Sequence, residues 1–427
     1  MPTFPDALRY WLKLGFISFG GPAGQIAIMH QELVEKRRWI SEEHFLHALN
    51  FCMLLPGPEA TQLATYLGWR LHGAKGGIAA GALFVLPSAV ILFVLSWVFM
   101  LSGGVAWLAA VFHGLLPCVI AVVASAALRM GRKALKSATL WAVAAASFVA
   151  VFFFHLSFVW LVLAAGALGG LGHRLAPRQF PAGRGHGSAA ADHADHLVLP
   201  ACPPQSAGRV VRVTLVCLAL WWLPVLAVAL WLGGGSTQAQ QGLFFSKAAL
   251  VTFGGAYAVL PYVAQQAVER HGWLTHAQMM SGLALAETTP GPLIMVLQFV
   301  GFVGGWQHPG MLSPPAGAAL GAAITTWVTF VPCFLFVFLG APHIEQLRSR
   351  PRLGAALTCI TAAVVGVVLN LGVQFSLHAL WPPTGGFDVF VAVVALLAFA
   401  AMERWKIGIM PVIAAGALLG LLRHLIQ

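Results

Sequence analysis

Two lysines, Lys13 and Lys247, occupy equivalent places in two similar stretches of a very apolar chain. Each lies six residues before a Phe-Gly-Gly motif. An ammonium group inside an apolar segment is costly to bury, so each lysine is a candidate contact for an anion. Their equivalence predicts one dianion held between the two side chains. The alternative is that each lysine extends its charged end to the nearest polar surface, because both lie near the start of a segment.

Two carboxylates lie beside the two Pro-Gly-Pro motifs. Glu59 directly follows the first motif, and Glu287 lies three residues before the second. A carboxyl group in apolar surroundings binds a proton more readily than one in water, so either residue could exchange a proton for an anion. For Glu59, the alternative is a structural role in the first turn of a helix, where a negative charge is favourable.

The glycines and prolines of these motifs should break helices, and each break leaves backbone N–H groups free at the start of the next helix. Those groups and the positive end of the helix dipole attract anions. Neighbouring hydroxyl and amide groups could add donors, although Ser and Thr more commonly bond their own helix backbone. Besides the two lysines, the candidate binding set is Ser18, Gly20, Gly21, Pro22, Gly57, Pro58, Thr61, Gln62, Thr252, Gly254, Gly255, Thr288, Thr289 and Gly291.

These motifs belong to an internal repeat with an offset of 234 residues. Between positions 19 and 58, eleven of forty residues are identical at this offset without a gap. Helices broken in corresponding places of two copies are typical of secondary transporters. The breaks therefore predict a substrate site near the middle of a membrane protein.

The composition supports a membrane protein. Hydrophobic residues make up 59% of the chain, charged residues 9%, and the mean hydropathy is +0.83. The net charge of +11 comes from short Lys and Arg clusters between apolar segments. Retention of positive loops on the cytoplasmic side explains such clusters better than nucleic-acid binding does. The six cysteines show no metal, haem or disulfide spacing, so we expect packing roles, no cofactor and no metal site.

We predict an all-α polytopic membrane protein built from two inverted repeats with broken or re-entrant helices. The predicted parts are an N-terminal transport repeat (1–172), a flexible cytoplasmic linker (173–209), a linking transmembrane helix (210–232) and a C-terminal inverted repeat (243–427). Segments one and two of each copy should be re-entrant hairpins, because a single crossing would export the basic residues Lys36, Arg37 and Arg38.

Loop charges predict the orientation of the two copies. One loop of the first copy carries Arg129, Arg132, Lys133 and Lys136, whereas its counterpart near 376–386 has no Lys or Arg. Two other loop pairs show the reverse contrast: their second-copy members carry Arg348, Arg350 and Arg352 in one case and Arg404 and Lys406 in the other, while their first-copy members have no Lys or Arg. The N-terminus and linker should therefore be cytoplasmic and the C-terminus outside, in a bacterial inner membrane.

The chain resembles the chromate ion transporter (CHR) superfamily, in its long-chain, two-domain form. The resemblance rests on Phe-Gly-Gly-Pro at 19–22, Leu-Leu-Pro-Gly-Pro at 54–58, and the second-copy stretches 253–263 and 288–292. It implies export of chromate from the bacterial cytoplasm and chromate resistance. The second copy departs from the pattern by having Ala256 where the first has Pro22, so the two copies need not contribute equally.

Other functions stay open at this point. Sulfate or another tetrahedral oxyanion could be the substrate, since lysines, helix ends and hydroxyls distinguish such anions poorly. A passive channel is compatible with the repeat. An intramembrane enzyme is less favoured, because no GxSxG, HExxH or CxxCH motif occurs, and we expect no enzymatic activity. The expected partners are the oxyanion and membrane lipid, with a homodimer as a further option.

Overall fold

The computed structural model describes residues 2–19, 21–101, 105–177, 179–180, 206–253, 255–341, 351–382 and 385–426. Every regular element among these residues is a helix, and seven helices are long and apolar enough to cross a membrane. The predicted all-α polytopic class is confirmed. Most of the predicted linker, including Asp192, His193, Asp195 and His196, lies outside the described residues.

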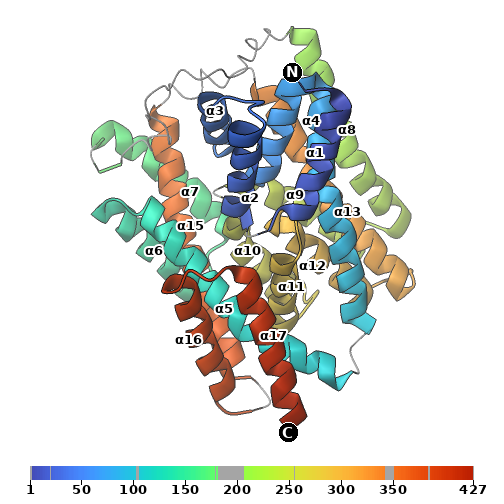
Figure 1. Ribbon diagram of the computed structural model, residues 1–427, viewed down its shortest axis with the longest axis vertical. Coiled ribbons are helices and arrows are strands. Elements are labelled where there is room, and N and C mark those ends of the chain that lie inside the picture. The colour runs from blue at the N-terminus through green and yellow to red at the C-terminus, as the bar shows by residue number, and fades with distance from the viewer. Residues whose placement is uncertain are drawn as a thin grey trace.

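Figure 1 shows the helices coloured along the chain, from blue at the N-terminus to red at the C-terminus. Their bounds are α1 (Phe4–Ile17), α2 (Gly21–His30), η1 (Gln31–Lys36), α3 (Glu42–Cys52), α4 (Glu59–Leu101), α5 (Ala106–Ala134), α6 (Ala138–Phe154), α7 (Phe158–Leu175), α8 (Ala207–Leu232), α9 (Thr237–Val251), α10 (Ala256–Ala264), η2 (Gln265–Arg270), α11 (His276–Thr288), η3 (Leu293–Met295), α12 (Val296–Gln307), α13 (Pro314–Gly340), α15 (Pro351–Leu380), α16 (Val389–Glu403) and α17 (Ile409–Ile426).

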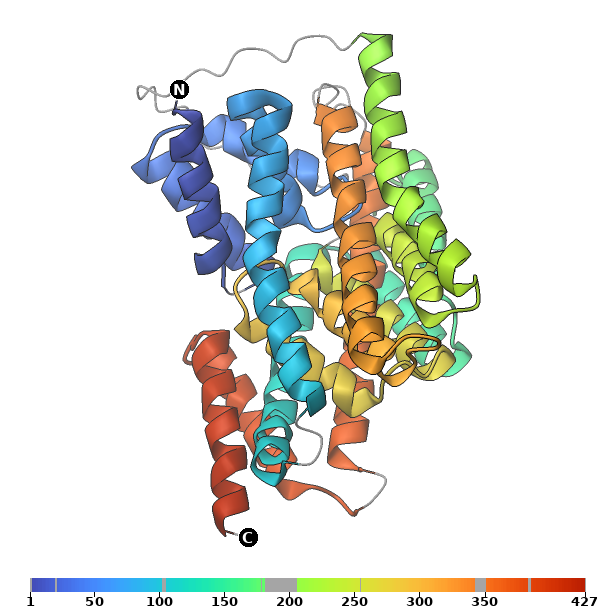
Figure 2. The ribbon, with the colours of Figure 1, turned by 90° about the vertical axis from the view of Figure 1, so that its right-hand side faces the viewer.

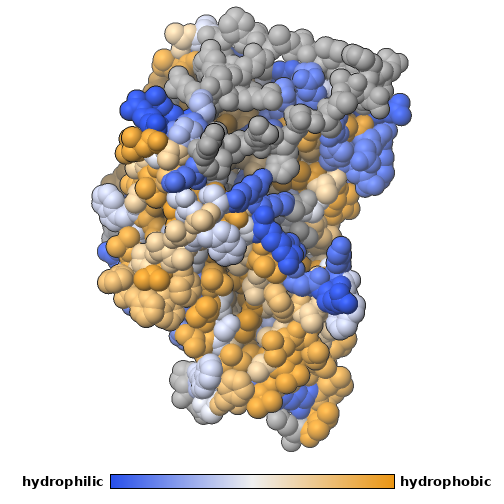
Figure 3. All heavy atoms as spheres, turned by 90° about the vertical axis from the view of Figure 1, so that its left-hand side faces the viewer, coloured by the Kyte–Doolittle hydropathy of each residue, from blue (hydrophilic) through white to orange (hydrophobic). Residues whose placement is uncertain are grey.

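Much of the outer surface is apolar. Large side chains such as Phe153, Phe154 and Leu396 are 65%, 72% and 71% exposed. Figure 3 shows hydrophobic residues over much of the lower part of one side, with hydrophilic residues more frequent toward the top. An exposed apolar surface of this kind fits contact with lipid rather than water.

The first broken segment forms a hairpin that returns to the side where it starts. Pro2, just before α1, and Trp39, just after η1, line the same pocket. The Trp39 ring also lies 5.6 Å from the ring of Tyr10 in α1. The chain therefore reverses at the glycine break, and the basic residues that follow η1 stay beside the N-terminus.

The second broken segment, α3 with the beginning of α4, forms another hairpin on the same side. Glu42 at the start of α3 places a carboxylate oxygen 2.5 Å from Nε2 of His30. Farther along, Nε2 of His72 lies 3.0 Å from the carbonyl oxygen of Pro2. Both ends of this hairpin thus lie near the N-terminus, as the re-entrant interpretation predicts.

Helix α4 reverses direction at His72 and Gly73, where Gly73 has φ +63°. A Cβ atom on Gly68 would lie 2.5 Å from the carbonyl oxygen of Gly76. In a straight helix those residues would be about 12 Å apart, so the two arms of α4 pack antiparallel. The second arm is the long helix that descends through the molecule in Figure 2.

The second copy forms matching hairpins from α9, α10, α11 and α12. The rings of Phe244 in α9 and Trp273 after η2 lie 5.8 Å apart. His308, after α12, has Nε2 3.1 Å from the carbonyl oxygen of Gly272. Helix α8 leads from the end that holds the N-terminus toward the start of α9, so these hairpins begin at a different level of the molecule (Figure 2).

The remaining long helices are exchanged between the two halves of the chain. Helices α16 and α17 pack against α5, while α6 and α7 pack against α15. A Cβ atom on Gly416 of α17 would lie 2.6 Å from the carbonyl oxygen of Gly114 in α5. At the other crossing, a Cβ atom on Gly169 would lie 2.5 Å from the carbonyl oxygen of Ala355. The small glycines let the helix backbones touch, so each half covers the long helix of the other.

Charged side chains join loops that are far apart in sequence. Arg132, at the end of α5, pairs with Glu403 at the end of α16 at 3.2 Å, and Ser125 donates a hydrogen bond to the same carboxylate. Asp388, before α16, pairs with Arg423 at 3.3 Å and with His113 at 3.1 Å. The basic loops around 129–136 and 404–406 therefore lie together.

Candidate functional site

The first break in each copy has the same backbone geometry. Ser18 has φ −82° and ψ 74°, and Thr252 has φ −77° and ψ 87°. In both places the residue after it donates its N–H to the carbonyl oxygen before it, at 3.0 Å. These are inverse γ-turns, and they leave the carbonyl groups of Ser18 and Thr252 free to accept bonds from elsewhere.

The Pro-Gly-Pro breaks of each copy meet the γ-turns of the other copy. The N–H of Gly57 donates to the carbonyl oxygen of Thr252 at 2.7 Å, and the N–H of Gly291 donates to that of Ser18 at 2.8 Å. Both pairs match under the 234-residue offset. All four breaks thus meet at two equivalent junctions, which we call the Gly57–Thr252 and Gly291–Ser18 junctions.

Glu59 faces the Gly57–Thr252 junction from the first turn of α4. Its Oε1 lies 3.7 Å from the position that a Cβ atom of Gly255 would occupy, and Gly255 is the N-cap of α10. Within the described residues, Glu59 makes no hydrogen bond or ion pair. Its carboxylate therefore lies at the start of a helix from the other copy.

Glu287 is held at the other junction through a tyrosine. The hydroxyl of Tyr257, in α10, donates a hydrogen bond to Oε1 of Glu287, which is buried at 4% exposure. A Cβ atom on Gly21 would lie 4.0 Å from that hydroxyl oxygen. The start of α2 thus faces a tyrosine hydroxyl of the second copy, whereas the start of α10 faces a carboxylate of the first.

Several buried polar atoms near the junctions have no hydrogen-bond partner among the described residues. An unpartnered buried polar atom costs about 1–3 kcal/mol, so such a group calls for a water molecule or a ligand. Around the Gly57–Thr252 junction and the first turns of α4, the atoms are Oγ1 of Thr61 and Oε1 of Gln62. Around the Gly291–Ser18 junction they are Oγ of Ser18, Oε1 of Gln25 and Oγ of Ser88.

Three of the four predicted threonines differ from these residues. The hydroxyls of Thr252, Thr288 and Thr289 donate to carbonyl oxygens of their own helices at 2.6, 2.8 and 3.0 Å. This is the structural alternative that the sequence left open, and it favours Ser18 and Thr61 as the free hydroxyls. Pro22 and Pro58 begin the helices that follow two breaks, whereas Gly20 and Gly254 lie outside the described residues.

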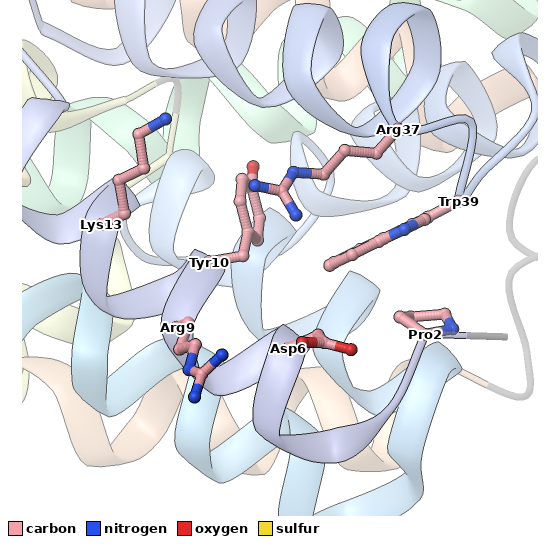
Figure 4. Close-up of a pocket in the computed structure, with 7 residues that line it drawn as sticks. All are labelled: Pro2, Asp6, Arg9, Tyr10, Lys13, Arg37 and Trp39. Atoms are coloured by element: carbon pink, nitrogen blue, oxygen red, sulfur yellow. The ribbon is translucent and has the colours of Figure 1, made fainter.

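The two lysines lie in separate pockets. Lys13 lines a cavity of 370 Å³ with Asp6, Arg9, Arg37 and other residues (Figure 4). Lys247 lines one of 250 Å³ with Arg270 and other residues. Both lysine side chains are exposed. The sequence analysis expects one dianion between the two lysines, whereas in the structure each lysine lines a pocket of its own. The role of the lysines in binding stays a prediction.

The two pockets are counterparts under the repeat offset. Five lining positions correspond: 6 with 240, 9 with 243, 10 with 244, 13 with 247 and 37 with 271. The first pocket has Arg9 and Arg37 where the second has Leu243 and His271. The first pocket sets Arg9, Lys13 and Arg37 against Asp6, and the second holds Lys247 and Arg270, so both pockets carry the same net permanent charge of +2.

Four residues at the junctions escaped the sequence analysis. Nε2 of Gln25 donates to the carbonyl oxygen of Gly291 at 2.5 Å, and a Cβ atom on Gly291 would lie 2.5 Å from Cβ of Ser88. Tyr257 bonds Glu287, and Cys333 lies 3.0 Å from the Cβ position of Gly57. Gln25 and Tyr257 lie in the first turns of helices that follow a break, so their sequence positions could have predicted a place near the junctions. Ser88 and Cys333 come from helices distant in sequence, and nothing in the sequence indicates their place.

The structure is that of an all-α polytopic membrane protein with a buried polar site. It combines helices of membrane-spanning length, hairpins whose helices are interrupted, and unpartnered polar atoms at the interruptions. The family model described as "Chromate transporter" matches residues 6–170 and again 239–421. The chain belongs to the chromate transporter family. The two matched regions leave out α8 and the predicted linker.

Curated relatives align with nearly the whole chain. The chromate transport protein of Pseudomonas aeruginosa is 32% identical over 98% of this chain and 92% of that protein. The chromate transport protein of Cupriavidus metallidurans is 29% identical over 99% of this chain and 94% of that protein. A probable chromate transport protein of Synechococcus elongatus is 30% identical over 94% and 89%. No solved structure matches the chain.

Proposed function

We propose that this protein exports chromate from the cytoplasm of a bacterium, driven by the proton gradient, and thereby confers chromate resistance. The observation that carries the proposal is the reciprocal pair of junctions, where four broken helices and five unpartnered polar atoms meet. Free N–H groups and helix dipoles at such breaks suit a tetrahedral dianion. Membership of a transporter family implies transport rather than enzymatic turnover.

The proposed path uses the two pockets as mouths of the site. The oxyanion would bind first at the pocket of Lys13, Arg9 and Arg37, whose positive charge raises the local anion concentration. It would pass the two junctions and leave through the pocket of Lys247. Since both pockets carry the same net permanent charge, the direction of transport would come from the proton gradient rather than from a difference in pocket charge.

The orientation follows from the loop charges. The pairing of Arg132 with Glu403 supports a common side for the basic loops around 129–136 and 404–406. Under the positive-inside rule that side is cytoplasmic, together with the N-terminus, and the C-terminus lies outside. Two inverted repeats, joined by the linker and α8, would produce this topology.

Cysteine labelling tests the orientation and the hairpins together. In a background without Cys202, we expect Arg38→Cys and Lys75→Cys to react with an impermeant maleimide only from the cytoplasmic side. Gly234→Cys should react only from the outside. The five cysteines Cys52, Cys118, Cys217, Cys333 and Cys359 are buried and should remain silent. Labelling of positions 38 and 75 from different sides would contradict the re-entrant hairpins.

Charge removal in the pockets tests the lysines. Lys13→Gln and Lys247→Gln should each lower chromate uptake into inverted vesicles about tenfold or more, because a hydrogen bond to a charged group contributes about 1.5–3 kcal/mol. Lys75→Gln is the matched control, since Lys75 is exposed at the turn of α4, outside both pockets. Uptake at the wild-type rate in both variants would leave the lysines as surface anchors only.

Sulfate is the second candidate substrate, because it has the same shape and charge as chromate. The same vesicles decide between them when unlabelled sulfate or chromate competes with labelled chromate. Chromate should inhibit at much lower concentration than sulfate. Equal inhibition would make the protein a general oxyanion transporter, and flux that ignores a protonophore would argue against proton coupling.

A further inference from the structure

The carboxylate of Glu59 lies where an anionic ligand of α10 would lie. Helix α10 starts after Gly255, which has φ +95° and provides no side-chain cap. Oε1 of Glu59 is 3.7 Å from the Cβ position of that glycine. The free N–H groups and the positive dipole end of α10 therefore face a negative charge supplied by the other copy.

Unpartnered polar groups accompany this carboxylate. Thr61 and Gln62, on the same turn of α4, are fully buried, and their Oγ1 and Oε1 atoms have no hydrogen-bond partner among the described residues. Nε2 of Gln62 donates to the carbonyl oxygen of Pro56 at 2.7 Å, which places this amide at the Gly57–Thr252 junction. Glu59 alone leaves the Thr61 hydroxyl without an acceptor, and a tetrahedral oxyanion could supply one; Oε1 of Gln62, itself an acceptor, would need a water molecule.

Few charged side chains act on the carboxylate of Glu59. The groups that act on it electrostatically are the thiol of Cys52 in α3 and the side chain of Lys133 at the end of α5, with Cys333 of α13 next to Cys52. Lys133 is exposed and forms no ion pair with Glu59. Tyr257 of α10 is engaged with Glu287 of α11. Among the described residues, no side chain pairs with Glu59, and the positive end of α10 lies beside it.

We infer that Glu59 is an internal competitor of the substrate: its carboxylate and the transported oxyanion occupy the N-terminus of α10 in turn. The inference rests on the proposed oxyanion transport and gives it a coupling step. When Glu59 takes up a proton, the neutral carboxylic acid no longer attracts the helix end and leaves it to the dianion. When the dianion departs, the carboxylic acid releases its proton and returns. The ionised carboxylate and the dianion therefore occupy the same position alternately.

Equilibrium binding to the purified, detergent-solubilised protein tests this step without transport. Sulfate and chromate serve as probes, followed by calorimetry between pH 5.5 and 8. Sulfate remains a dianion over this range, so any change in its affinity comes from the protein. We expect wild-type affinity for sulfate to increase as the pH falls, because protonation removes the competing charge.

The variant Glu59→Gln should bind both anions about tenfold more tightly than wild type at pH 8, since it lacks the negative charge that competes for the helix N-terminus. Its sulfate affinity should be nearly independent of pH. Glu269→Gln is the matched control, because Glu269 is exposed at the end of η2, away from both junctions, and this variant should retain the wild-type pH dependence. Glu59→Ala provides a second neutral variant if the glutamine variant folds poorly.

The outcomes separate this inference from the proposed function. If wild type and Glu59→Gln bind with equal affinity at every pH, or if the variant binds more weakly, Glu59 does not compete and the inference is wrong, although chromate transport stands. If sulfate binds with the expected pattern but chromate does not bind, the competition stands and the substrate assignment fails. If no oxyanion binds to either protein, both are overturned.

Discussion

Gly291→Ala should abolish chromate transport and lower the thermal midpoint of the protein. Gly291 has φ +108°, and an added Cβ atom would lie 2.5 Å from Cβ of Ser88 and 3.6 Å from the carbonyl oxygen of Phe84. The backbone strain costs about 1–2 kcal/mol and the overlap about 1–3 kcal/mol. The break would shift, and the hydrogen bond from its N–H to Ser18 would be lost. Vesicle uptake and a thermal unfolding assay measure the two effects.

Two further variants separate strain from contact. Gly310→Ala has the same kind of backbone strain, with φ +64°, but no atom lies within 4 Å of its added Cβ, so transport should be preserved. Adding Ser88→Gly to Gly291→Ala removes the overlap and should recover part of the stability. Wild-type transport by Gly291→Ala alone would mean that the Gly291–Ser18 junction is not needed.

Gly416→Leu should have the largest effect on stability. Its Cβ atom would lie 2.3 Å from Sγ of Cys118 and 2.6 Å from the carbonyl oxygen of Gly114, and a backbone atom cannot move aside as a side chain can. Overpacking costs about 1–3 kcal/mol per site and more where helices must separate. We expect a severe loss of folded protein, measured as the monodisperse fraction after detergent extraction.

The control for this variant is Gly208→Leu in α8, where no atom lies within 4 Å of the added Cβ. It makes the same chemical change in a membrane-facing helix and should be tolerated. Normal yield and unfolding temperature for Gly416→Leu would contradict the close crossing of α5 and α17.

Local signals predicted much of this fold. Glycine and proline in the middle of apolar segments located the breaks, and the basic residues after η1 indicated that the chain turns back. These features act within a few residues, so the sequence expresses them directly. The class of protein and the hairpins followed from them.

Contacts across the repeat could not be predicted in the same way. The partners of Gly291 are Ser18, Gln25 and Ser88, more than 200 residues away in the chain, and no periodicity marks them. Sequence equivalence also suggested that Lys13 and Lys247 share one anion. Equivalence in a repeat means that each residue has a similar environment in its own copy, not that the two residues lie close together. Here each lysine lines the pocket of its own copy.

The exchange of long helices has a consequence for biosynthesis. Helix α5 leaves the ribosome well before α16 and α17, the helices that cover it. During that interval its glycine surface can contact only lipid or other early helices. Final assembly must therefore wait until the last segments have been inserted, and a nascent chain that stops early would expose an unmatched surface to the quality-control proteases of the membrane.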